Sequence, residues 1–216
     1  MMEENVKIEI GKKIGDFFLD HMRNASKRLW IVSPWLSPQY VKMAIDKKKD
    51  GVDVKIITTN NYVVGHKEAL KEIIEKKKDI VKKENRALTH LGKALIVLGL
   101  LGAIFSIFAI VLFVLGIALF LIGRERARVY FQAKIGDDNL IVYSFSAHPL
   151  HAKLYIADSK IMVGSANLTD AGLIKNTESM AIIENAELCE KIAEKIAKGQ
   201  WAKRLTIEEI AREIKL

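Results

Sequence analysis

Residues 151–173 read HAKLYIADSKIMVGSANLTDAGL, and this stretch decides both the fold and the site that we expect for the chain. Residues 151–157 and 160–165 each have the composition of a short β-strand, with a turn between them. Alternation along the first strand places His151 and Lys153 on the same face, one pleat apart. The two side chains can therefore reach one ligand.

The end of the second predicted strand supplies neutral hydrogen-bond donors. Ser165 and Asn167 follow Gly164, and their side chains lie beside exposed loop N–H groups of the kind that an oxyanion or a phosphate requires. An imidazole nucleophile, an ammonium group and neutral donors around one anion predict a phosphoryl-transfer site. On residue types alone, a structural role for a single strand histidine stays open.

The rest of the chain alternates between strands and helices. Apolar runs and helical spacing predict strands at residues 28–33, 52–59, 140–146 and 178–184, and helices at 37–51, 66–93 and 186–201. Ser37 is the expected N-cap of the first helix, because Pro38 suits the first helical position. Residues 124–136 are predicted to continue the preceding helix to a cap at Gly136, although their Val-Tyr-Phe centre leaves a strand possible. This order predicts an α/β sheet domain.

A run of thirty residues without a charged side chain, 94–123, interrupts this pattern. One helix of that length would reach about 45 Å, well beyond the ~30 Å hydrocarbon core of a bilayer. Basic residues flank both ends of the run, which places both ends on the cytoplasmic side. We therefore predict a transmembrane hairpin at 91–123 with a turn near 102–106, inserted into one catalytic domain formed by 1–90 and 124–216. The expected location is the cell membrane, multi-pass, with the catalytic domain on the cytoplasmic side.

The composition restricts the possible partners. The chain has 216 residues and a formal net charge of +8, from 34 Lys and Arg against 26 Asp and Glu, which suits a polyanion such as nucleic acid or an anionic membrane surface. A single cysteine excludes an internal disulfide. Since no cluster of His, Cys, Asp or Glu has the spacing of metal ligands, we expect neither a metal nor another cofactor.

Six residues of the opening stretch closely resemble the signature of the phospholipase D superfamily, the His-Lys-Asp phosphodiesterases: His151, Lys153, Asp158, Gly164, Ser165 and Asn167. The resemblance extends to residues 31–37, to 176–183 and to Trp201. It implies a mixed sheet flanked by helices, here carrying the inserted transmembrane hairpin.

The resemblance also implies roles for individual residues. His151 would attack phosphorus to give a phosphohistidine, Lys153 and Asn167 would hold the phosphate oxygens, and Glu178 would orient the histidine. Ser165 would support this arrangement. Because Trp35 follows the first strand at the end where α/β proteins bind ligands, we expect it to contact the substrate, although packing would explain it equally well.

Two further site residues belong to the motif itself. Gly164 is expected beside the substrate. Asp158 departs from the superfamily's usual spacing, because five residues separate it from Gly164 where the superfamily usually has six. This departure leaves open whether Asp158 serves the chemistry or only shapes a turn between two strands.

The sequence contains one His-x-Lys motif, whereas the superfamily's mechanism needs two histidines. The resemblance therefore implies a homodimer in which two copies share one active site. Three functions stay open: a nuclease, a phospholipase D or phosphatidyl transferase acting on membrane phospholipid, and a non-catalytic binding protein. The intact motif argues against the third, and the basic charge favours the nuclease slightly.

Overall fold

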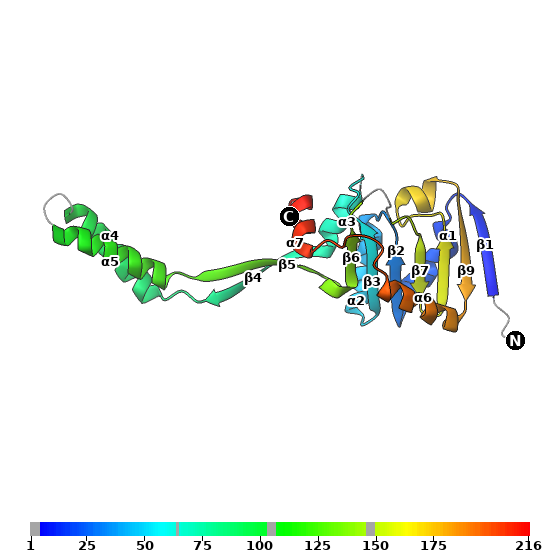
Figure 1. The fold of residues 1–216 in the computed structure, drawn as a ribbon, viewed down its shortest axis with the longest axis horizontal. Coiled ribbons are helices and arrows are strands. Elements are labelled where there is room, and N and C mark those ends of the chain that lie inside the picture. Colours follow the sequence, from blue (N-terminus) through cyan, green and yellow to red (C-terminus); the bar gives the residue numbers. More distant parts are fainter. Residues whose placement is uncertain (1–4, 64, 103–106, 146–149) are drawn as a thin grey trace. The chain divides into compact units, whose positions relative to one another are not determined.

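The structure is a computed structural model that describes residues 5–63, 65–102, 107–145 and 150–216 (Figure 1). The chain divides into two compact units, one formed by Met1–Lys76 with Phe131–Leu216 and the other by Lys77–Tyr130. The first unit contains every residue predicted for the site. The catalytic role assigned to residues 1–90 and 124–216 stays a prediction.

The first unit is built on a seven-stranded sheet with the order β1-β9-β8-β7-β2-β3-β6 (Figure 1). The strands are β1 (Asn5–Gly11), β2 (Arg28–Val32), β3 (Asp53–Thr59), β6 (Leu140–Tyr143), β7 (Leu154–Ala157), β8 (Lys160–Gly164) and β9 (Glu178–Glu184). β2, β3 and β6 run parallel, and the other neighbours pair antiparallel. The sheet is therefore mixed, as predicted, although β1 was not expected.

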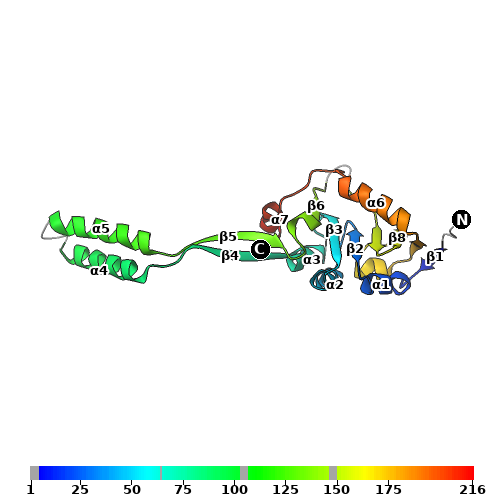
Figure 2. The same ribbon diagram turned by 90° about the horizontal axis from the view of Figure 1, so that it is seen from below.

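Alternation along the strands gives the sheet two buried faces. Leu29 and Ile31 of β2 belong to a core shared with four helices, whereas Trp30 and Val32 belong to a core shared with α6 (Ala186–Lys198). The four helices are α1 (Gly15–Arg23), α2 (Pro38–Lys49), α3 (His66–Ile73) and α7 (Ile207–Ile214). Figure 2 shows α6 on one side of the sheet and α1 and α2 on the other. The predicted α/β sheet flanked by helices is confirmed.

The helix ends follow local capping rules. α2 begins at Pro38 after Ser37, as predicted, and Gly51 beyond its end adopts the left-handed conformation with φ 85°. α6 begins after Asn185, whose side chain accepts a hydrogen bond from the Leu188 N–H. A capping box formed by Thr206 and Glu209 starts α7, a helix that was not predicted. A short π-helix, Ala171–Lys175, precedes β9.

The helix predicted over residues 66–93 is wrong in its middle part. α3 ends at Ile73, and β4 (Ile74–Lys82) pairs with β5 (Arg126–Ala133) in a separate two-stranded sheet. The helix expected at residues 124–136 is also replaced by a strand, the alternative that their Val-Tyr-Phe centre had left possible. Such pairing between segments forty residues apart leaves no trace in helical periodicity.

The uncharged run forms two helices, α4 (Arg86–Gly102) and α5 (Ile107–Gly123). Glycines bring them together: a Cβ on Gly92 would lie 2.5 Å from the Phe120 backbone nitrogen, and one on Gly99 would lie 2.6 Å from that of Phe113. Because those distances are far below van der Waals contact, only glycine permits the backbones to approach this closely.

The prediction of a transmembrane hairpin is contradicted, and with it the predicted location in the cell membrane. Among the described residues, no helix is both long and apolar enough to cross a membrane. α4 and α5 have 17 residues each, which corresponds to about 26 Å against the ~30 Å of a hydrocarbon core. Arg86 and Lys93 also lie within α4. Most of the turn predicted at 102–106 lies outside the described residues.

Candidate active site

The candidate site lies where β2 ends and β7 begins. Val32 of β2 pairs with Leu154 of β7, so the residues just before β7 lie beside those just after β2. His151 and Lys153 precede β7 rather than lying within it, which shortens the predicted strand. The Gly164 N–H of β8 nevertheless donates to the Lys153 carbonyl oxygen over 3.3 Å. This hydrogen bond extends the pairing of β7 with β8 by one residue.

Lys153 and His151 are in direct contact. The Lys153 Nζ lies 3.0 Å from both ring nitrogens of His151 and donates to the His151 carbonyl oxygen over 2.8 Å. Lys153 is only 6 % exposed, whereas His151 is exposed. Burial lowers the pKa of the Lys153 ammonium, and the negative charge of Glu178 opposes this change. The result is a fixed cation beside an accessible imidazole.

A second pair joins the ends of β8 and β9. The Ser165 hydroxyl donates to the Glu178 carboxylate and accepts from the Ser179 N–H over 3.0 Å. The Asn176 side-chain amide donates to the other Glu178 oxygen over 3.1 Å. The carboxylate is therefore held by two donors at the edge of the sheet that also carries Lys153.

Gly164 has a steric reason to be glycine. A Cβ at this position would lie 2.0 Å from the Ser179 carbonyl oxygen and 2.7 Å from the Met180 Sδ. Any side chain would force β8 and β9 apart and would separate Ser165 from Glu178. The contact that we predicted between Gly164 and the substrate stays a prediction.

Trp35 and Asn167 border a groove beside the histidine. The rings of Trp35 and His151 meet edge to face, with centroids 6.4 Å apart and planes at 89°. Trp35 and Asn167 both line a groove of about 490 Å³, together with Val63, Thr169 and Lys175. Within the described residues, Trp35 Nε1 and Asn167 Oδ1 are buried without a hydrogen-bond partner. A buried polar atom without a hydrogen bond lowers the stability of the fold. Such atoms are typical of a binding surface where a ligand would supply the missing hydrogen bonds.

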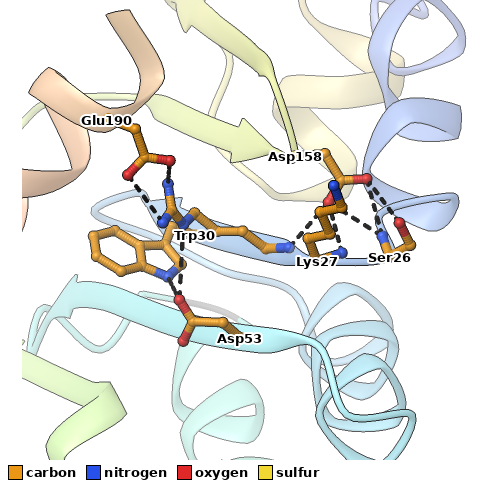
Figure 3. A network of polar contacts seen from close by, with 7 residues as sticks. Ser26, Lys27, Trp30, Asp53, Asp158 and Glu190 are labelled. Carbon is orange, nitrogen blue, oxygen red and sulfur yellow. Dashed lines mark hydrogen bonds and ion pairs between the residues drawn. The ribbon is translucent and has the colours of Figure 1, made fainter. Parts of the chain in front are cut away.

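Asp158 lies at the opposite end of β7, in the turn to β8. Its carboxylate accepts backbone N–H groups from Ser26 (3.0 Å), Lys27 (2.7 Å) and Arg28 (3.0 Å), as Figure 3 shows for Ser26 and Lys27. Partial burial alone would raise the pKa of Asp158, but these donors, with the Ser26 hydroxyl, outweigh it and lower the pKa below its usual value. The structure therefore does not bring Asp158 to His151.

The residues around Asp158 are also paired among themselves. Arg28 forms two hydrogen bonds with the Glu190 carboxylate, at 2.8 Å and 3.2 Å, and Trp30 Nε1 donates to Asp53 over 2.8 Å (Figure 3). Arg28 also lies over the Trp30 ring, 5.2 Å from its centroid. These contacts join the start of β2 to α6 and to β3. The polar groups at this end of the sheet therefore stabilise the fold.

Sequence reasoning missed one part of the site. Ser33, Thr58, Thr59 and His66 are buried polar residues behind the loop that carries Trp35. The one sequence feature that could have indicated this cluster is the pair Thr58-Thr59, which ends a strand whose other buried positions are apolar. Nothing in the sequence showed that His66 lies against this loop, because the two are thirty residues apart.

Residues 121–201 match the family model described as cardiolipin synthase, PLD-like domain. No curated protein sequence gives a significant match to the chain. Among solved structures, the chain resembles a phospholipase D family member, Nuc from Salmonella typhimurium, with 17 % identity over 94 % of this chain and 99 % of that one, at a TM-score of 0.51.

Two further solved structures are similar at lower scores. NucT from Helicobacter pylori has 12 % identity, covers 91 % of this chain and 94 % of that one, and gives a TM-score of 0.48. Phosphatidylserine synthase from Haemophilus influenzae has 12 % identity, covers 96 % of this chain and 42 % of that one, and gives 0.49. The fold assignment therefore rests on Nuc. The chain therefore has the fold of a phospholipase D family member, and its residues 121–201 match the PLD-like family model.

Proposed function

We propose that this chain is a phosphodiesterase of the phospholipase D superfamily that hydrolyses nucleic acid through a phosphohistidine intermediate. The observation that carries the proposal is the buried Lys153 ammonium, 3.0 Å from the ring nitrogens of the exposed His151. A cation fixed beside an accessible imidazole attracts a phosphodiester to a potential nucleophile.

The proposed reaction has two displacements. In the first, a ring nitrogen of His151 forms a bond to phosphorus, the bond from phosphorus to the leaving oxygen breaks, and a second histidine gives that oxygen a proton. In the second displacement, the histidine that gave up its proton takes a proton from water. The water oxygen then bonds to phosphorus while the bond from phosphorus to His151 breaks. One diester and one water become a monoester and an alcohol.

The remaining residues would stabilise charge and orientation. Lys153 and the Asn167 amide would hold the phosphate oxygens as negative charge builds up on them. Glu178 would orient His151, and Ser165 would keep that carboxylate in place through the hydrogen bond that joins them. Trp35 and Gly164 would border the bound substrate. Because the chain supplies its own cation, the chemistry needs no metal.

The substrate class follows from charge. A net charge of +8 favours a polyanionic substrate over a single lipid headgroup. Lipid phosphodiester chemistry is the second candidate, because the matching family model is described as cardiolipin synthase. We would incubate the purified protein in EDTA with DNA, RNA and labelled phospholipid in parallel. Cleavage of nucleic acid alone supports the proposal, release of lipid headgroup replaces it, and activity that returns only with Mg²⁺ excludes the phosphohistidine route.

The second histidine would come from a second copy of the chain, because the sequence contains one His-x-Lys motif. We propose a homodimer whose two His151 residues meet in one cleft. Mixed dimers of wild-type and His151→Ala chains should then be inactive, since each lacks either the nucleophile or the acid. With equal amounts mixed at random, activity per total protein should fall to roughly one quarter. A fall to one half, after verified exchange of subunits, would mean that each chain works alone.

A further inference from the structure

The first residue of α3 is a buried histidine with two defined hydrogen bonds. His66 is 1 % exposed. Its Nδ1 accepts from the Leu36 N–H over 3.1 Å, and its Nε2 lies 2.7 Å from the Thr59 carbonyl oxygen. A carbonyl oxygen can only accept, so both contacts form together only when the ring is neutral and carries its proton on Nε2. Burial lowers the pKa of His66, which favours this neutral form.

The Leu36 N–H belongs to the loop that carries Trp35. Buried hydroxyl groups hold the same loop at other points. Ser33 donates to the Trp35 carbonyl over 2.7 Å, and Thr58 and Thr59 each donate to the Pro34 carbonyl over 3.0 Å. His66 is the only one of these side chains that can lose its acceptor by protonation.

The position of this loop decides where the Trp35 ring lies. That ring is in edge contact with His151 on one side and lines the groove beside Asn167. A shift of the loop would therefore move the wall between the proposed nucleophile and the groove. Displacements of about 1 Å around reacting groups cost up to roughly 100-fold in rate.

We propose that His66 is a positioning residue, whose neutral ring accepts the Leu36 N–H and so fixes Trp35 against His151. Its effect on turnover rests on the proposed function. Its effect on the contact between Trp35 and His151 does not, and that contact can be measured in a protein without substrate.

Two substitutions separate the two hydrogen bonds of His66. The amide oxygen of His66→Asn can take the place of Nδ1 and keep the acceptor for Leu36. The amide nitrogen of His66→Gln reaches the place of Nε2 and keeps only the donor to Thr59. We would make both in a Trp30→Phe, Trp201→Phe background, where Trp35 is the sole tryptophan of the three in the chain.

The readout is the fluorescence of Trp35 with and without His151→Ala. Because a neighbouring imidazole changes indole emission, the difference between these two proteins reports the contact between the rings. We expect this difference to persist in His66→Asn and to disappear in His66→Gln. In the wild-type tryptophan background, kcat/KM should fall roughly 10–100-fold in His66→Gln and less than threefold in His66→Asn.

Circular dichroism and a thermal melt establish that each variant is folded. If both variants keep the emission difference, or if both lose it while folded, the proposal is overturned. Should His66→Gln not fold, His66→Asn decides alone, because loss of the difference there would remove the role of the Leu36 hydrogen bond. If no protein cleaves a phosphodiester, the proposed function fails, whereas the emission result still tests the role of His66.

Discussion

The two ends of β7 belong to the same sequence motif, yet they have opposite characters. At the N-terminal end of β7, which His151 and Lys153 precede, the lysine is buried next to the imidazole. Trp35 Nε1 and Asn167 Oδ1, near this end, have no hydrogen-bond partner among the described residues. At the other end, Asp158 accepts three backbone N–H groups and its pKa is lowered. Arg28 Nε at this second end is also buried without a hydrogen bond, but it lies 3.8 Å from the Asp53 carboxylate. Apart from this atom, polar groups at the first end are costly to the fold, whereas those at the second stabilise it.

Within one motif, the residues near His151 are therefore those expected to react, and Asp158 is expected to stabilise the fold. A site that binds a phosphate must keep donors free and a cation partly desolvated before the ligand arrives. A turn that anchors a strand must satisfy its groups within the protein. We therefore expect substitutions at the first end to change activity and substitutions at the second end to change stability.

The largest expected effect is that of His151→Ala. Loss of the proposed nucleophile should lower kcat by at least about 1,000-fold. The side chain is exposed, so the free energy of unfolding should change by no more than about 0.5 kcal/mol. Steady-state kinetics and urea unfolding measure the two effects. Activity within tenfold of wild type would remove His151 from the mechanism.

Lys153→Met tests the same end in a different way. Loss of the charge that faces the phosphate should lower kcat/KM by roughly 100–1,000-fold. Because burial lowers the pKa of Lys153, the folded protein holds this charge at a cost, and the melting temperature should stay the same or rise. Calorimetry of the free protein measures the second effect. A large fall in melting temperature would make Lys153 a structural residue.

Asp158 provides the opposite pattern. Asp158→Gly should lower the free energy of unfolding by roughly 2–3 kcal/mol, because three backbone N–H groups lose a charged acceptor. Activity at a temperature where the variant is folded should change less than threefold, about 0.6 kcal/mol. Asp158 has φ 53°, so Asp158→Ala should cost roughly a further 1 kcal/mol that glycine avoids. A hundredfold loss of activity with unchanged stability would instead give Asp158 a chemical role.

The smallest effect is a pH dependence of stability with two separate windows. The folded-state pKa of His66 is lowered from 6.5, so its neutral form stabilises the protein above that pH, and this contribution is lost as the pH falls through the folded pKa. The folded-state pKa of Asp158 is lowered from 3.8, so the stabilising contribution of its carboxylate is likewise lost as the pH falls below that value. Unfolding measured from pH 8 to pH 3 should show both losses.

Two variants identify the origin of each window. His66→Asn should reduce the dependence just below pH 6.5, where burial also lowers the pKa of His21 and leaves a remainder, and Asp158→Gly should reduce the one below pH 3.8. If the upper window keeps its full size in His66→Asn, His66 makes no contribution to it.

Local sequence patterns were enough to predict several elements of the fold. The Ser37-Pro38 helix start, the buried strand at 28–33 and the strand at 178–184 follow from capping preferences and short apolar runs. A spacing of two residues predicted that His151 and Lys153 could reach one ligand, and the structure adds a contact between the two side chains. Local rules failed at 74–82, where helical spacing was overridden by pairing with β5. They also failed at the uncharged run, whose described helices are too short to span a bilayer.

The sequence by itself determined which chemical groups the motif supplies: the imidazole of His151, the ammonium of Lys153, the hydroxyl of Ser165 and the amide of Asn167, followed by the carboxylate of Glu178, in an order that predicts phosphoryl transfer. Only the tertiary structure decided which of them meet. Pairing of β8 with β9 joins Ser165 to Glu178, and pairing of β7 with β2 brings Trp35 to His151. It also placed Asp158 at the far end of a strand and His66 behind the Trp35 loop. Such contacts join residues up to 132 positions apart, and their free energy comes from packing and burial that no local pattern records.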